Sequence, residues 1–186
     1  IMALFDYTIE ACDGAARAAT YETAHGTFQT PMFMPVGTRA TVKGIQPEQL
    51  HELQSQVVLA NTYHLSMRPG ADLIEEAGGV QKFMCYDGPM LTDSGGFQVM
   101  SLADTLKIDA DGLTFHSIYD GAKVRWTPES NMEIQQKIGA DICMQLDQCA
   151  PYPAERAFVE KSTRLSADWA RRCLAAHTKP NQTLFG

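Results

Sequence analysis

The chain has 186 residues, of which 45% are hydrophobic, and it carries a formal net charge of -7 with an isoelectric point near 5.1. This length and composition fit one globular domain with a proper core. Neither a signal segment nor an apolar run long enough to span a membrane occurs, so we expect a cytoplasmic protein with no membrane partner. The acidic charge argues against nucleic-acid binding by overall electrostatics and leaves room only for local basic patches.

Cysteine usage and basic residues give two further expectations. The five cysteines are scattered and odd in number, and no two have CxxC spacing, which favours reduced thiols over disulfides or a local zinc site. Near the C-terminal end the basic residues are frequent enough for a patch, although a solvated helix face is the more expected interpretation. These basic residues are Lys161, Arg164, Arg171, Arg172, His177 and Lys179.

The first forty residues alternate polar and apolar side chains and predict antiparallel strands. Three segments carry the pattern: FDYTIEA, ARAATYETAHG and TFQTPMFMPVG. Pro31 and Pro35 restrict the third segment to a sheet edge or a bulge, because proline cannot donate to a strand ladder.

After Gly44 the pattern becomes strand, polar residues, helix, and it occurs three times. Apolar runs predict parallel strands, and periodic segments with proline starts and glycine stops predict helices. The strands are VVLA (57–60), PMLT (89–92) and DICMQL (141–146); the helices are 47–54, 70–79, 128–139, capped by Thr127, and 154–177. Residues 106–126 predict a hairpin with a two-residue turn at Asp120 and Gly121. The fold class is therefore α/β, built from parallel βα units.

The run PMLTDSGGFQVMSL, residues 89–102, is the strongest local signal of function. Asp93 stands where an apolar strand stops, and Ser94 follows it with a hydroxyl. Gly95 and Gly96 then leave the backbone open to a ligand. The alternative is a strand-to-helix turn in which Asp93 or Ser94 is the helix cap, and this segment alone leaves both interpretations open.

Polar residues recur at the same position of each unit. Asn61, Asp93 and Asp147 each follow a predicted parallel strand, and loops at the carboxyl ends of such strands carry the chemistry. If the strands are neighbours, the three side chains line one rim and form a site for a polar small molecule. A metal-dependent hydrolase or lyase that uses Asp93, Asp147 and His64 is an alternative, which the separation of the three in sequence disfavours.

The last residues, Thr183 to Gly186, predict the opening of a fourth strand. Three units and part of a fourth do not close an eight-stranded barrel, and unpaired strand edges are unfavourable. We therefore expect these residues to belong to a longer protein or to pair with another chain.

Five long motifs resemble the queuine tRNA-ribosyltransferase family, also called tRNA-guanine transglycosylase. They are GTRATVKGIQPEQL, NTYHLSMRPG, LTDSGGFQVMSL, NMEIQQKIGADI and LDQCAPYPA, and the resemblance extends over essentially the whole chain. It implies the N-terminal half of a (β/α)8 barrel: an antiparallel sheet in residues 1–44, then the first three βα units and the start of the fourth barrel strand in 45–186. A β-hairpin insertion is expected after the second barrel strand.

The resemblance also implies an activity. The family exchanges guanine at the tRNA wobble position, in the anticodon loop, for the 7-deazaguanine preQ1 or queuine, through a covalent ribosyl-enzyme intermediate, in queuosine biosynthesis. Asp93 matches the general acid/base, Asp147 the residue that reads the base, and Phe97 the aromatic that stacks on it. Ser94, Gly95, Gly96 and Asn61 match substrate-pocket positions, and Cys149 matches a cysteine typical of bacterial members, which favours preQ1.

Other family features are expected beyond Gly186: the nucleophilic aspartate, further base-recognition loops and the Zn²⁺ ligands. No metal ligand is therefore expected in this chain, and residues 1–186 alone are expected to be inactive. The full-length protein is expected to form a homodimer. The alternative within the family is a noncatalytic partner subunit that has lost active-site residues, and the presence of both Asp93 and Asp147 disfavours it.

Overall fold

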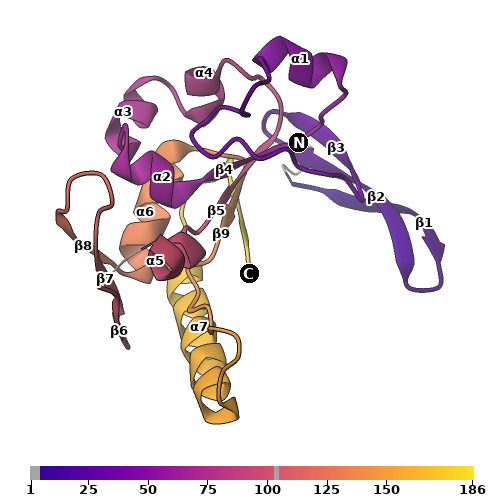
Figure 1. Cartoon of the computed structure of the whole chain (residues 1–186). Helices are drawn as coiled ribbons and strands as arrows, with labels where there is room; N and C mark the ends of the chain where they lie inside the picture. Colours follow the sequence, from indigo (N-terminus) through magenta and orange to yellow (C-terminus); the bar gives the residue numbers. More distant parts are fainter. Residues whose placement is uncertain (1–4, 103–104) are drawn as a thin grey trace.

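A four-stranded parallel sheet forms the centre of the molecule (Figure 1). The computed structural model describes residues 5–102 and 105–186. The strand order is β10-β9-β5-β4, with β4 Val58–Asn61, β5 Met90–Asp93, β9 Ile142–Met144 and β10 Thr183–Phe185. Most apolar side chains of β4, β5 and β9 are buried, as expected for a parallel sheet, whereas β10 is more exposed. Over these described residues the fold is thus mixed α/β, with one parallel sheet and two antiparallel ones.

The N-terminal antiparallel sheet is shorter than the sequence predicts. It contains β1 Tyr7–Asp13, β2 Ala16–Thr23 and β3 Gly26–Thr30, in that order. The segment TFQTPMFMPVG is not one antiparallel strand, because β3 ends before Pro31. Val36 instead forms a parallel bridge with Leu59 of β4, so the second half of the segment lies along an edge of the central sheet.

A second antiparallel sheet follows β5 in the chain. It contains β6 Lys107–Asp109, β7 Gly112–His116 and β8 Lys123–Trp126. The connection from β7 to β8 is longer than the predicted two-residue turn. It runs from Ser117 to Ala122 and is closed by a hydrogen bond from the Ser117 amide to the Ala122 carbonyl, 2.9 Å.

The helices depart from the predicted boundaries in two places. The polar residues after β4 form a helix at once. The predicted helix 70–79 is present as a shorter helix that ends ahead of Gly78 and Gly79, both with positive φ, and a further short helix that was not predicted begins at Val80. The helices are α1 Pro47–Glu52, α2 Thr62–Met67, α3 Ala71–Glu76, α4 Val80–Met84, α5 Gly96–Leu102, α6 Pro128–Ile138 and α7 Arg156–Ala176. Thr127 caps α6 and Gly139 ends it in the left-handed conformation, as the sequence predicts.

The core joins the layers. One cluster of buried side chains lies between the central sheet and the short helices, a second contains Trp126 and Trp169, and a third unites Tyr21 and Phe28 of the N-terminal sheet with Ile142 of β9. No helix of the described residues has the length and apolar character needed to cross a membrane.

Candidate functional site

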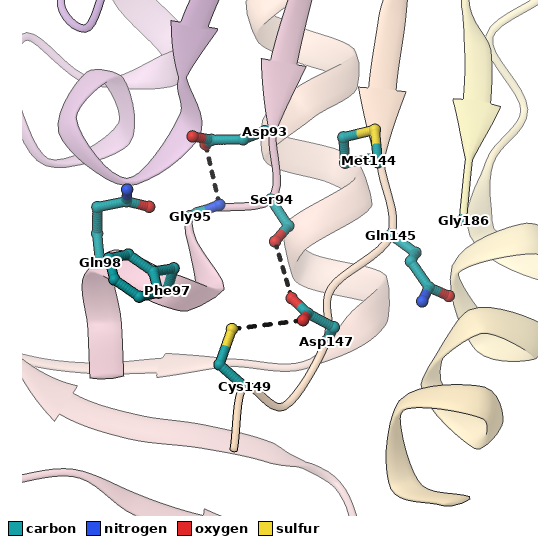
Figure 2. A pocket seen from close by; sticks show the side chains of 10 residues that line it. All are labelled: Asp93, Ser94, Gly95, Phe97, Gln98, Met144, Gln145, Asp147, Cys149 and Gly186. Carbon is teal, nitrogen blue, oxygen red and sulfur yellow. Dashed lines mark hydrogen bonds between the residues drawn. The ribbon is translucent and has the colours of Figure 1, made fainter. Parts of the chain in front are cut away.

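A cavity of about 350 Å³ opens at the carboxyl ends of β5 and β9 (Figure 2). It is formed by the β5–α5 turn on one side and the segment after β9 on the other. Its lining residues are Asp93, Ser94, Gly95, Phe97, Gln98, Met144, Gln145, Asp147, Cys149 and Gly186. Six of the eight site residues predicted from the sequence therefore line one cavity.

Asp93 is held rigidly at the end of β5. Its carboxylate accepts hydrogen bonds from the Asn61 amide side chain, 2.7 Å, and from the backbone N–H groups of Gly95, 3.1 Å, and Thr62, 3.3 Å. Burial raises the pKa of Asp93 to about 6, although these three donors act to lower it. A carboxyl group that titrates near neutral pH can both give and take a proton.

The β5–α5 turn is both the strand-to-helix turn and the wall of a cavity, the two interpretations that the sequence left open. It is a strand-to-helix turn, because α5 begins at Gly96 and the Ser94 hydroxyl accepts from the Gly96 amide, 3.2 Å. It is also a wall of the cavity. A Cβ on Gly96 would lie 3.0 Å from the Asp147 carbonyl oxygen and 3.1 Å from Asp147 Oδ1, so the glycine lets the two sides approach.

Asp147 faces Asp93 across the cavity and has a different environment. Its Oδ1 receives only a long hydrogen bond from the Ser94 hydroxyl, 3.5 Å, and its Oδ2 accepts from the Cys149 thiol, 3.4 Å. Both donors are neutral and weak, so the carboxylate keeps lone pairs for a ligand. Burial and the neighbouring Asp147 raise the pKa of Cys149 to about 11, so this thiol is protonated near neutral pH.

Asn61 contacts Asp93 directly but does not line the cavity. Asn61 is buried, its Oδ1 accepts from the His64 amide at the start of α2, and its amide group donates to Asp93. It therefore positions Asp93 and does not line the cavity. Gly96 also lies outside the lining, where it provides space for Asp147. Phe97, in contrast, lines the cavity and is 57% exposed.

The metal-site alternative finds no geometric support. The His64 ring is hydrogen-bonded through Nδ1 to the Tyr119 hydroxyl, 2.9 Å, and is absent from the cavity lining. Within residues 5–102 and 105–186, no group of three or more His, Cys, Asp and Glu side chains could hold a metal ion. The ligands of the Zn²⁺ that the family resemblance implies are expected beyond Gly186, outside these residues.

Two buried polar residues of α6 were missed by sequence reasoning. Gln135 accepts from the Met144 amide, 3.1 Å, and donates to the Met144 carbonyl, 2.7 Å, while Asn131 donates to the Ser94 carbonyl, 2.9 Å. Their polar character on a buried helix face was the available signal. Among the lining residues, Gln98, Met144, Gln145 and Gly186 were not predicted either.

Comparison with known proteins identifies the family of this chain. Residues 12–186 match the family described as queuine tRNA-ribosyltransferase. Proteins of that name from Herpetosiphon aurantiacus, Deinococcus radiodurans and Gloeobacter violaceus are 53%, 51% and 53% identical over 98%, 100% and 99% of this chain. These alignments cover 46–49% of the relatives, so the chain spans about half their length. The chain belongs to the queuine tRNA-ribosyltransferase family.

Proposed function

We propose that the cavity binds the purine base in a tRNA-guanine transglycosylase, which replaces the wobble guanine of the anticodon loop by a 7-deazaguanine, preQ1 or queuine. The observation that carries the proposal is the pair of carboxylates, Asp93 and Asp147, on opposite walls of one cavity with the Phe97 ring also in its lining. The two groups differ in hydrogen bonding, which suits them to different tasks.

Asp147 is proposed to recognise the base. A carboxylate can accept from the N1–H and the 2-amino group of guanine together, a pattern shared by 7-deazaguanines and by no other common RNA base. Asp147 contacts Ser94 and Cys149 only weakly, so its carboxylate oxygens can release these donors and bind the N–H groups of the base instead. Phe97 would stack on the flat face of the base, and the protonated Cys149 would fill the edge of the pocket.

Asp93 is proposed to handle the proton. In the first half-reaction a nucleophilic aspartate outside the described residues attacks the ribose C1′, the C1′–N9 bond breaks, and protonated Asp93 delivers a proton to the departing guanine. In the second, the carboxylate takes a proton from the incoming base while the ribosyl–enzyme bond breaks. The number of protons is restored over one cycle, and a pKa near 6 suits both directions.

The remaining family properties are proposals about the whole protein. We propose that residues 1–186 form one part of a single catalytic domain whose parallel sheet continues into a (β/α)8 barrel, that a Zn²⁺ site lies outside these residues, and that the cytoplasmic full-length protein forms a homodimer. Residues 1–186 expressed alone are expected to release no guanine from tRNA, because the chain spans about half the length of its relatives.

The test uses protein expressed from the complete reading frame and tRNA labelled at the wobble guanine. Addition of preQ1 should release labelled guanine, and Asp147→Asn should lower kcat/KM for the base by about a hundredfold or more, because an amide cannot accept two N–H groups. Asp13→Asn, an exposed carboxylate of β1, is the matched control and should change little. No release by the wild type, or equal activity of Asp147→Asn, would overturn the proposal.

A further inference from the structure

One buried side chain of α6 has no assigned part in the proposed base exchange. Asn131 is 0% exposed and contacts the β5–α5 turn from outside the cavity lining. Its amide group donates to the Ser94 carbonyl, 2.9 Å, and its Oδ1 accepts from the Gln135 amide group, 2.8 Å. Burying an amide group costs free energy unless it is hydrogen-bonded, so these two partners show what Asn131 holds in place.

The carbonyl that Asn131 binds belongs to the same peptide group as a donor to Asp93. The Ser94 carbonyl and the Gly95 N–H are the two ends of one trans peptide group, so they move together as a rigid plane. The Gly95 N–H donates to Asp93 Oδ1, 3.1 Å (Figure 2). This peptide group is therefore held at its carbonyl by Asn131 and at its N–H by the carboxylate of Asp93.

The local backbone does not fix the orientation of this peptide group by itself. Gly95 has a φ of +76°, and a Cβ there would lie 2.8 Å from the Tyr63 backbone nitrogen, so the position requires glycine. Glycine restricts backbone rotation less than any other residue. A side chain outside the turn must therefore supply the restraint. Asn131 is suited to this task because Gln135 fixes it in turn, with further hydrogen bonds to both backbone groups of Met144.

We propose that Asn131 is a positioning residue for proton transfer by Asp93: it fixes the peptide group whose N–H binds the Asp93 carboxylate, and so stabilises the ionised form of that carboxyl. The hydrogen bond at the carbonyl end also polarises the peptide group and makes its N–H a stronger donor. Asn131 does not line the cavity, so it acts only through Asp93. This inference rests on the proposed function, in which Asp93 gives and takes a proton.

The titratable groups around Asp93 determine the direction of the expected effect. Asp147, across the cavity, acts to raise the pKa of Asp93. Burial keeps the other neighbours neutral near pH 7, because it raises the pKa of Tyr63 in α2 and of Cys149 after β9 and lowers the pKa of His64 in α2. Neither β4, α5 nor the buried face of α6 carries an ionisable side chain.

Against this background the Gly95 N–H lowers the pKa of Asp93, whereas burial raises it. Removing Asn131 frees the peptide group to rotate and weakens this N–H donor. The pKa of Asp93 should then rise above its value of about 6.

The first test follows guanine release from labelled tRNA without preQ1, using protein expressed from the complete reading frame. This step needs protonated Asp93, so kcat/KM of the wild type should fall as the pH rises through about 6. In Asn131→Leu, which removes the amide group at similar volume, the midpoint should lie about 0.5 to 1 pH unit higher. Met132→Ala, at the next buried position of α6, loses packing but no contact with Ser94 and should leave the midpoint unmoved.

A second variant and a second measurement guard against misfolding of Asn131→Leu. Asn131→Thr has a shorter side chain, whose hydroxyl can bond to the Thr127 carbonyl within α6, and it should move the midpoint in the same direction. Chemical denaturation needs no activity. The stability difference between each Asn131 variant and its Asp93→Asn derivative should be lost at a pH about 0.5 to 1 unit higher than in the wild-type pair, since a higher folded-state pKa retains the proton to higher pH.

The outcomes separate this inference from the proposed function. If the wild type releases guanine and neither Asn131 variant moves the midpoint, or if Met132→Ala moves it equally, the positioning role is refuted and the proposed function stands. A wild type that releases no guanine refutes the proposed function. The denaturation midpoints then decide alone, and unmoved midpoints refute the positioning role of Asn131 as well.

Discussion

Two aspartates of the same cavity behave differently because their surroundings differ. Asp93 is enclosed and saturated with N–H donors, whereas Asp147 has only a hydroxyl and a thiol at long range. Sequence position predicted that both would lie at one rim, because each follows a parallel strand. It could not predict their hydrogen bonding, since Asn61 and Thr62, which hold Asp93, come from a different strand-to-helix junction.

The raised pKa of Asp93 predicts a pH dependence of stability. The folded-state pKa of about 6 lies above the ordinary value of 3.8, so the folded protein holds this proton more tightly than the unfolded chain does. The resulting stability is fully present below about pH 4 and is lost as the pH rises through 6. The unfolding free energy of wild type minus Asp93→Asn should therefore fall by about 2 to 3 kcal/mol from pH 4 to 7.

Chemical denaturation of both proteins at a series of pH values measures this difference, in which titrations of other groups cancel. A difference that does not change with pH would show that Asp93 titrates alike in the folded and unfolded states. A rising difference would mean that its hydrogen bonds outweigh its burial.

Gly96 predicts an effect on binding that is separable from folding. In Gly96→Ala the new methyl group would press on Asp147 at 3.0 to 3.1 Å, although alanine is otherwise well suited to the first turn of α5. We expect base affinity to fall about tenfold or more with a stability loss of about 1 kcal/mol at most. Isothermal titration with preQ1 and denaturation report the two quantities, and Ser101→Ala in the same helix should alter neither. Unchanged base affinity would contradict the proposed role of Asp147.

At the scale of elements, α6 explains why a cavity exists between two hydrogen-bonded strands. β5 and β9 pair only through Leu91 with Ile142 and Thr92 with Cys143. Beyond these pairs the side-chain amide of Gln135 replaces the neighbouring strand as hydrogen-bond partner, because it binds both the N–H and the carbonyl of Met144. The strand ends therefore separate without leaving unpaired backbone groups, and the cavity opens between them.

Gln135→Leu should consequently destabilise the protein by about 2 to 4 kcal/mol, since it leaves both backbone groups of Met144 without a partner in a partly buried position and removes the buried amide of Gln135 itself. Thr92 and Asn131 lose hydrogen bonds to the same amide group. Glu133→Leu, on the exposed face of the same helix, should cost less than about 1 kcal/mol. Urea denaturation compares the two, and a similar effect of both variants would exclude this function of Gln135.

The element pattern was predictable where it depends on local signals. Proline at the start and glycine at the end gave α6 within one residue, and the apolar runs located β4, β5 and β9. The departures have tertiary causes: Val36 joins the central sheet by a parallel bridge to Leu59, a pairing that sequence periodicity does not encode. Similarly, α2 begins directly after β4 because Asn61 caps it, so a residue predicted to lie in a loop is a helix N-cap.

At the scale of the whole molecule, Asp141 connects layers that the sequence analysis treated as separate. Its side chain is fully buried at the start of β9 and accepts from the Met90 amide of β5 and the Gln81 side chain of α4, each at 2.9 Å. It also accepts from the His25 amide, 3.2 Å, and contacts the His25 ring at 2.8 Å. His25 lies in the turn between β2 and β3, so one carboxylate joins both sheets.

This arrangement predicts that the N-terminal sheet and the central sheet unfold together. Asp141→Ala should lower stability by about 3 kcal/mol or more, because several buried donors lose their acceptor. His25→Ala should cost only about 1 kcal/mol, since that side chain is partly exposed. Both tryptophans lie in the cluster beside β7, β8 and α7, remote in sequence from the N-terminal strands. Their fluorescence and far-UV circular dichroism should therefore shift to the same lower midpoint in Asp141→Ala, whereas two separate transitions would show that the sheets fold independently of this carboxylate.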